Sequence, residues 1–339
     1  MLHTRICELL GIELPIISAG MGGVALSNLA AAVSDAGGFG FIGLAGFSPS
    51  AIHNEIAAAR KLTQKPIGLN LLIPFLRPGV VETVAEEPVA AVTFFWGAPA
   101  DYAASIRRLQ DARIKVIWQC GSAAEARAAA AAGVDAIMAQ GLEAGGHVRG
   151  TTGTLALIPA VRDAIGDLPL MAAGGLADGR GLAAALALGA DAGVFGTRFL
   201  VANESAAHRE YKRAVIGAQA DDTLHTTLFD IGWPDAPHRV IRNATVEAWE
   251  RAGRPPSGAR PGEGDPSAAM RRSGIEVPLV RYSVFPPTEY MEGDISGLAF
   301  YAGQSCSLVN EALPAAEIVR RIADEARAVI ANRLAPLAR

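Results

Sequence analysis

One histidine stands in a sequence context that could place it at a reaction site. Of the six histidines, His147 follows an apolar run directly, inside the glycine-rich string QGLEAGGHVRG. An imidazole titrates near neutral pH, so it can take up or release a proton during a reaction. No second ligand lies at helical or strand spacing from it, so we expect no metal site. We expect His147 to be a catalytic base, although a loop histidine bonded only to backbone would give the same pattern.

Glu143 belongs to the same string and has two interpretations. It could serve as a second acid, or its carboxylate could accept hydrogen bonds from nearby loop backbone. We favour the structural role.

Two glycine-containing turns could bind a phosphate. Gly174 and Gly175 end one apolar run, and Gly196 and Thr197 lie in the next. Glycine lets backbone N–H groups approach a ligand, and clustered N–H groups at a helix start attract anions. Thr197 adds a hydroxyl donor. If the two runs are neighbouring strands, both turns would form one phosphate site.

Amide side chains at the ends of other runs could bind a polar ring. Asn70, Gln119 and Gln140 offer both donors and acceptors, which suits the pyrimidine edge of a flavin, although they could equally bond loop backbone. A ring site and a phosphate site together indicate a mononucleotide such as FMN. Pyridoxal phosphate would need a lysine at the end of a run, and none lies there.

These residues need a framework that brings the ends of the runs together. Between most of the runs lie alanine-rich amphipathic segments, and strands alternating with helices indicate parallel βαβ units. We therefore predict a (β/α)₈ TIM barrel, in which reacting groups gather at the carboxyl ends of the strands. The rival, a doubly wound sheet, would need an acid after the second strand, which is absent. The eight runs are residues 15–20, 39–44, 67–72, 90–97, 115–120, 136–141, 169–175 and 192–200.

Four polar residues are expected to start helices between these strands. A side-chain oxygen at the residue before a helix accepts a hydrogen bond from the first turn. The predicted caps are Ser27, Ser48, Ser122 and Asp178.

The periodic pattern stops after residue 200, which divides the chain. We assign residues 1–218 to the barrel and residues 219–290 to an irregular, arginine- and proline-rich segment inserted after strand eight. This segment could be a lid over the barrel mouth, or a surface decoration or dimer contact. Residues 291–339 are expected to return to the barrel, with an amphipathic helix over 315–334 packing on it.

Composition and charge limit the kinds of molecule that this protein is expected to bind. The net charge of −4, without a basic stripe, argues against nucleic acid. No run of about 18 apolar residues exists, so we expect no membrane span. The three cysteines are isolated, and the N-terminal sequence does not resemble a secretory signal; we expect reduced thiols and a cytoplasmic location. A homo-oligomer is possible.

Several longer strings resemble the nitronate monooxygenase family, formerly called 2-nitropropane dioxygenase. They are PIISAGMGGVALSNLAAAVSDAGGFGFIG, GLNLL, AQGLEAGGHVRG, MAAGGLADGRGLAAALALGADAGVFGTRFL and YAGQS, in this order. The resemblance implies an FMN-containing barrel that oxidises alkyl nitronates or nitroalkanes with dioxygen to a carbonyl compound and nitrite. His147 would be the base towards a neutral nitroalkane, or would hold the anionic nitronate when protonated. The expected FMN contacts are Gly20, Met21, Gly22, Asn70, Gln119, Gln140, Ala144, Gly145, Gly146, Gly174, Gly175, Gly196 and Thr197.

The resemblance leaves the substrate open. Similar barrels with the AGGH loop include NAD(P)H-dependent FMN reductases that act on an enoyl thioester or a quinone, and fold alone does not fix the substrate. A flavin-free barrel that binds a phosphorylated metabolite is a third alternative. Many relatives have GGHRG where this chain has GGHVRG, which shifts Arg149 by one position.

Overall fold

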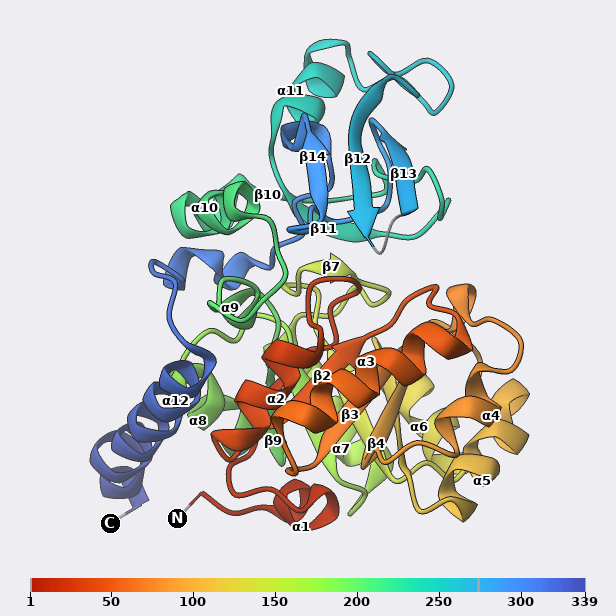
Figure 1. Cartoon of the computed structure of the whole chain (residues 1–339). Coiled ribbons are helices and arrows are strands. Elements are labelled where there is room, and N and C mark those ends of the chain that lie inside the picture. Colours follow the sequence, from red (N-terminus) through yellow and green to blue (C-terminus); the bar gives the residue numbers. More distant parts are fainter. Residues whose placement is uncertain (1, 273–274, 339) are drawn as a thin grey trace.

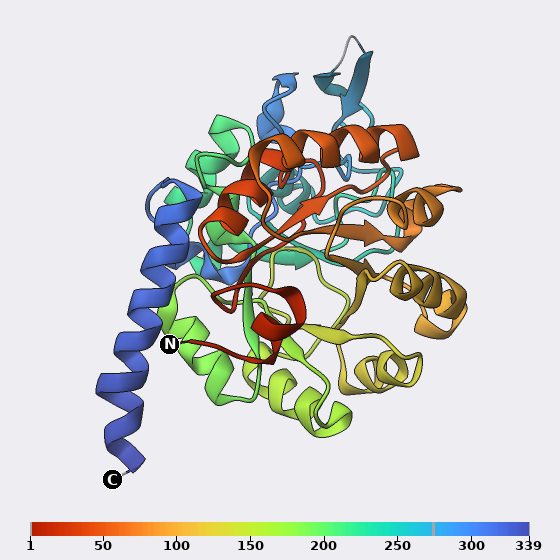
Figure 2. The same ribbon diagram turned by 60° about the horizontal axis from the view of Figure 1, so that its bottom comes forward.

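The computed structural model describes residues 2–272 and 275–338. A closed barrel of parallel strands forms its centre, in the order β1-β2-β3-β4-β5-β6-β8-β9 (Figures 1 and 2). Each strand lies within one of the eight predicted runs, so the TIM-barrel prediction is confirmed. The strands are β1 (Ile16–Ser18), β2 (Phe39–Gly43), β3 (Ile67–Leu72), β4 (Ala91–Phe95), β5 (Lys115–Cys120), β6 (Ala136–Gln140), β8 (Leu170–Ala173) and β9 (Ala192–Phe195).

Helices surround the barrel, and a short helix closes its amino-terminal end. The apolar side chains of α1 (Arg5–Leu10) pack with Ile17, Phe39 and Phe41, which fill the barrel interior. A separate apolar cluster joins the outer faces of the strands to the surrounding helices. The strands are thus buried on both faces, which explains their continuously apolar runs. The surrounding helices are α2 (Ser27–Asp35), α3 (Pro49–Leu62), α4 (Val80–Val84), α5 (Ala103–Asp111), α6 (Ala123–Ala131), α7 (Thr154–Ile165) and α8 (Gly179–Ala187).

Three of the four predicted helix caps are present. The side chains of Ser48, Ser122 and Asp178 accept hydrogen bonds from the first turns of α3, α6 and α8. Ser27 is instead the first residue of α2, because its backbone N–H donates to the Glu55 carboxylate at 2.8 Å. That partner lies on α3, too far along the chain for a local pattern to reveal it.

The inserted segment has more regular structure than expected. Helix α11 (Ala244–Arg251) and two small antiparallel sheets occupy much of it, ordered β10-β11-β7 and β13-β12-β14. The segment stands over the end of the barrel at which the strands finish (Figure 1). The prediction of irregular structure was wrong for these strands because their sequences lack clean apolar alternation. The strands of the segment are β10 (Thr223–Thr226), β11 (His238–Ile241), β12 (Pro266–Arg272) and β13 (Ile275–Val280). The two sheets are completed by β7 (Gly146–His147), from the loop after β6, and by β14 (Met291–Gly293), which follows the segment.

The last part of the chain returns to the barrel. Helix α12 (Ala315–Val329) lies beside α8 and buries Ile318, Val319 and Ile322 in the cluster that covers the strands (Figures 1 and 2). A π-helical turn, Ile330–Leu334, continues it to the predicted end. Two further helices, α9 (Thr197–Leu200) and α10 (Arg209–Gly217), connect β9 to the inserted segment. Within the described ranges, every helix is too short or too polar to cross a membrane.

Candidate active site

A cavity of about 950 Å³ lies between the carboxyl ends of the barrel strands and the inserted segment. Every residue that the sequence analysis assigned to the site lines this cavity, including His147 and all the expected FMN contacts. Its wall also contains residues that the sequence did not point to, among them Trp233 and Tyr301. The barrel therefore brings together residues that the sequence distributes over six strand ends.

His147 is held in the wall of this cavity by strand pairing. Strand β7 pairs antiparallel with β11, which places His147 opposite His238. The imidazole stacks on Trp233, with ring centroids 4.1 Å apart, and lies 5.4 Å from the Tyr301 ring. Its Nε2 atom is buried and has no hydrogen-bond partner among the described residues. One imidazole nitrogen of this cavity-lining residue therefore has no hydrogen-bond partner among the described residues.

The surroundings of His147 keep its imidazole neutral. Burial, and secondarily the neighbouring His238, lower the pKa of His147 from 6.5 to about 2. A neutral imidazole can accept a proton, whereas a standing positive charge is disfavoured in this position. Of the two roles expected for His147, the lowered pKa argues against a protonated group that binds an anion.

His238 is a positioning residue for this arrangement. Phe229 N–H donates to His238 Nε2 at 3.3 Å, and Nδ1 lies 2.9 Å from the Ala236 carbonyl oxygen. Both contacts are satisfied by one neutral tautomer that carries its proton on Nδ1. Burial lowers the pKa of His238 to about 4. His238 is thus fixed in orientation and supports the β7–β11 pair.

Trp96 completes the aromatic group around His147. It follows β4 and has a φ of 73°, in the left-handed region that bulky residues rarely adopt. Its ring lies 4.8 Å from that of Trp233 and 6.0 Å from that of His147. Such backbone strain tends to concentrate at functional sites. We call Trp96, Trp233, His238 and Tyr301 the aromatic cage.

The glycine turns after β8 and β9 fit a bound phosphate. Gly174 has a φ of 99°, and a Cβ there would lie 3.0 Å from the Gly141 carbonyl oxygen, so only glycine suits this turn. A Cβ on Gly196 would meet one atom, the Ala19 Cβ, at 3.8 Å, which leaves open space beside the backbone. Gly303 N–H donates to Thr197 Oγ1 at 3.0 Å, and the Thr197 hydroxyl hydrogen remains free to donate.

The amide end of the cavity fits the polar edge of a flavin. Gln140 Nε2 donates to the His147 carbonyl oxygen at 3.2 Å, which orients the amide. Its Oε1 is buried and unpartnered among the described residues, so it can accept a hydrogen bond from a ring N–H. Gln119 is 8% exposed and lines the same wall. The donors and acceptors present therefore match the ring and the phosphate of FMN.

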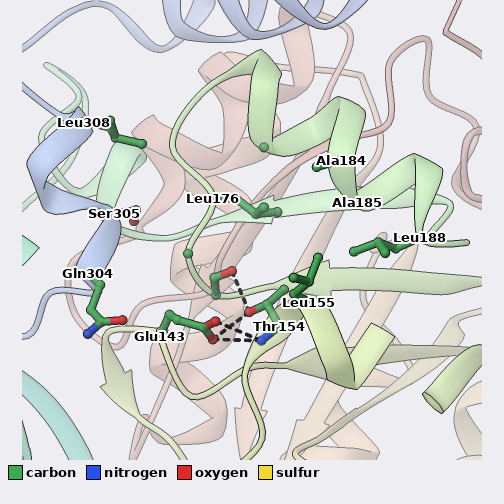
Figure 3. Close-up of a pocket in the computed structure, with 13 residues that line it drawn as sticks. Glu143, Thr154, Leu155, Leu176, Ala184, Ala185, Leu188, Gln304, Ser305 and Leu308 are labelled. Carbon is green, nitrogen blue, oxygen red and sulfur yellow. Dashed lines mark hydrogen bonds between the residues drawn. The ribbon is translucent and has the colours of Figure 1, made fainter. Parts of the chain in front are cut away.

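Glu143 has the structural role that we favoured. Its two carboxylate oxygens accept from Thr154 N–H at 3.0 and 2.9 Å. The Thr154 hydroxyl lies 2.9 Å from Glu143 Oε2 and 3.0 Å from the Gly174 carbonyl oxygen (Figure 3). These contacts stabilise the turn after β8.

A smaller cavity of about 350 Å³ lies next to this turn, between α7, α8 and the segment Gln304–Leu308 (Figure 3).

Most arginines near the site are committed to structural contacts. Arg149 pairs with Glu125 at 2.8 Å and does not line the cavity. In the inserted segment, Arg260 pairs with Asp230 at 2.8 Å and with Glu263. Arg239 donates to the Leu142 carbonyl oxygen at 3.0 and 3.3 Å, and so holds the loop before His147. Among the described residues, Arg77 is the arginine that lines the large cavity.

Solved structures with the same architecture cover nearly the whole chain. FabK from Thermotoga maritima has a TM-score of 0.78 and 32% identity, and the match covers 97% of each chain. The nitroalkane oxidase from Streptomyces ansochromogenes has a TM-score of 0.73 and 29% identity, over 95% of this chain and 97% of that one.

Curated relatives carry two different activity names. A Pseudomonas aeruginosa nitronate monooxygenase is 35% identical over 95% of this chain and 99% of its own length. A Mycobacterium tuberculosis (3aS,4S,5R,7aS)-5-hydroxy-7a-methyl-1-oxo-octahydro-1H-indene-4-carboxyl-CoA dehydrogenase is 40% identical over 75% of this chain and 70% of its own. The family model for nitronate monooxygenase matches residues 3–79 and 77–325. The chain therefore belongs to the nitronate monooxygenase family of FMN-dependent oxidoreductases.

Proposed function

We propose that this enzyme oxidises alkyl nitronates, and the nitroalkanes that give rise to them, with dioxygen to a carbonyl compound and nitrite. The observation that carries the proposal is His147: a neutral imidazole with an unpartnered nitrogen, in the wall of a cavity that fits FMN. The family match and the likeness to a nitroalkane oxidase support the same substrate class. Family membership also removes the support for a flavin-free barrel.

His147 would act as the base towards a neutral nitroalkane. It takes the α-proton, and the negative charge that develops on the nitro group raises the pKa of the imidazole while the proton moves. A preformed nitronate has already lost this proton and does not need the base. Trp233 stacks on the imidazole and His238 pairs with its backbone, so the proton acceptor stays in one orientation.

The cofactor would be held by the residues that line the inner cavity. The turns at Gly174–Gly175 and Gly196–Thr197 would bind the phosphate, and Gln119 and Gln140 would bind the ring edge. When bound, FMN supplies the redox chemistry between the substrate and dioxygen. The inserted segment would be a lid, because Trp233, Val284 and Thr288 from this part of the chain line the cavity and limit access of water.

A second candidate is NAD(P)H-dependent reduction of an enoyl thioester or a quinone. It is favoured by the 40% identity to the Mycobacterium tuberculosis carboxyl-CoA dehydrogenase and by a cavity much larger than a small nitroalkane needs. In that reaction an NAD(P)H-dependent flavin enzyme would act on an enoyl thioester or a quinone. The same His147 would then serve as the proton donor or acceptor.

Aerobic turnover of propyl 1-nitronate and propyl 2-nitronate tests the proposal. We expect FMN-containing enzyme to consume dioxygen and release nitrite, together with propanal or acetone, without any nicotinamide. Absence of nitrite with both nitronates, combined with oxidation of NADH or NADPH in the presence of an enoyl thioester or a quinone, would contradict it and support the second candidate.

A further inference from the structure

The large cavity extends well beyond the cage around His147. Its inner end contains buried side chains, such as Gln119 and Gln140, which are 8% and 7% exposed. Its lining also includes exposed residues, namely Ser50, Asn54 and Arg77. The cavity thus runs from the barrel interior outward to the surface. At about 950 Å³ the cavity is at the upper end of the roughly 300–1,000 Å³ typical of ligand pockets, and its lining continues well beyond the residues expected to contact FMN.

An apolar wall leads from His147 into this outer part. The Phe75 ring lies 5.2 Å from that of Trp233, and Trp233 stacks on His147. From the inserted segment, Met270, Val277 and Phe285 line the same cavity. Phe285 is 43% exposed, so part of this apolar wall is open to solvent. These side chains, with Phe75, define an outer compartment that suits an aliphatic arm.

Among the described residues, Arg77 is the one arginine or lysine in the lining of the large cavity. Arg77 follows Phe75 by two residues and is exposed, and the described part of the chain offers its side chain no ion pair or hydrogen bond. The acidic side chain in the lining, Glu55, is buried and accepts a hydrogen bond from the Ser27 N–H. The arginines of the inserted segment that pair with carboxylates, such as Arg260, lie outside this lining. Arg77 is therefore available to an anion that enters with the substrate.

We propose that the outer compartment binds an aliphatic arm of the substrate and that Arg77 binds an anionic group at the end of this arm. The ligand class is an extended, apolar molecule with a terminal carboxylate or phosphate. This deepens the proposed function, on which it rests for the identity of the reacting end: the preferred substrate would be a long-chain, ω-anionic nitronate rather than a simple nitroalkane.

Binding of unreactive ligands tests the compartment without turnover. Straight-chain carboxylates from butanoate to dodecanoate, with alcohols and alkyl phosphates of equal length, are titrated into FMN-containing enzyme, and the change in flavin absorbance gives Kd. We expect Kd to fall about two- to fourfold per methylene until the compartment is filled. We expect anions to bind roughly three- to tenfold more tightly than the alcohols, because Arg77 is partly screened by solvent. The better anion identifies the terminal group.

Single substitutions, each with a control variant, test which side chains cause the preference for anions and the gain in affinity per methylene. Arg77→Met should remove the preference for anions and Arg77→Lys should keep part of it, whereas Arg107→Met, at an exposed arginine outside the cavity, should change nothing. Phe285→Ser should reduce the gain per methylene. Leu155→Ser should not, because Leu155 is 72% exposed and lines the smaller cavity.

The result separates this inference from the proposed function. A Kd that does not depend on chain length, or a preference for anions that survives Arg77→Met, would overturn the inference even if nitronates are oxidised. Chain-length dependence with an Arg77-dependent preference, in an enzyme that fails to oxidise any nitronate, would support the compartment and contradict the proposed function.

Discussion

Lowering the pH from 7 to 5 should leave His147 in its neutral, active form. A histidine with an ordinary pKa would become protonated over this range and could no longer act as a base. Burial and His238 lower the pKa of His147 to about 2, so the free enzyme keeps a neutral imidazole at pH 5. A histidine with a pKa near 6.5 would be only about 3% neutral at that pH, which would lower kcat/KM by roughly 30-fold. For nitroethane kept in its neutral form, we therefore expect kcat/KM to be nearly constant between pH 7 and pH 5.

Trp233→Ala should introduce a loss of activity at acid pH. The indole is 8% exposed and stacks on the imidazole, so its removal admits water and weakens the desolvation that lowers the pKa. The variant should lose kcat/KM at pH 5 relative to pH 7, up to the roughly 30-fold limit of a solvated histidine. Trp249→Ala is the control, because Trp249 belongs to α11 in the same inserted segment and does not line the cavity.

The assay measures kcat/KM from initial rates of nitrite release, with FMN retention checked by absorbance at each pH. A wild-type profile with a midpoint near pH 6.5 would refute the reasoning, because His147 would then be solvated or would not be the base. An identical acid loss in both tryptophan variants would show that the effect does not arise from stacking on His147.

Three further outcomes follow from the geometry. His147→Ala should retain FMN and lose about 10²- to 10⁴-fold in activity on neutral nitroalkanes, with a much smaller loss on preformed nitronates; equal losses on both, measured as nitrite release, would remove its role as a base. Gly196→Asp should release FMN, whereas Gly196→Asn should retain more of it, because both side chains enter the same open space and only the aspartate repels a phosphate. Flavin absorbance after gel filtration measures how much FMN each variant retains. The free energy of unfolding should fall as the pH drops below 6.5, by about 2 kcal/mol per histidine at pH 5. The cause is that the pKa values of His147 and His238 are lowered in the folded state, so the unfolded chain binds more protons. Denaturant titrations of the wild type and of His147→Ala would contradict this if both showed the same pH dependence.

The barrel and the inner site could be predicted because their signals are local. Each strand is a continuous apolar run, and the residue that lines the cavity lies in the second half of the strand, as at Asn70 and Gln119, or directly after it, as at Gly196. Ser48, Ser122 and Asp178 cap their helices through contacts within a few residues. The strands and helix caps depend on residues that are close together in the sequence, so the sequence pattern is enough to predict them.

The aromatic cage could not be predicted because its contacts join distant segments. Trp96 follows β4, His147 lies on β7, and Trp233 and His238 belong to the inserted segment, so the cage exists only once β7 and β11 pair. Two signals were available: two of the four tryptophans are in the cage, and Tyr301 begins the string YAGQS. The short strands of the inserted segment were missed for the related reason that they are stabilised mainly by pairing with one another.

The most direct test of the account is anaerobic mixing of the FMN-containing enzyme with propyl nitronate, in parallel with NADH and NADPH, while flavin absorbance near 450 nm is followed. We predict rapid bleaching by the nitronate, slow or absent bleaching by either nicotinamide, and recovery of the absorbance on admission of air with release of nitrite. Rapid bleaching by NADH or NADPH, with none by the nitronate, would contradict the proposed nitronate oxidation.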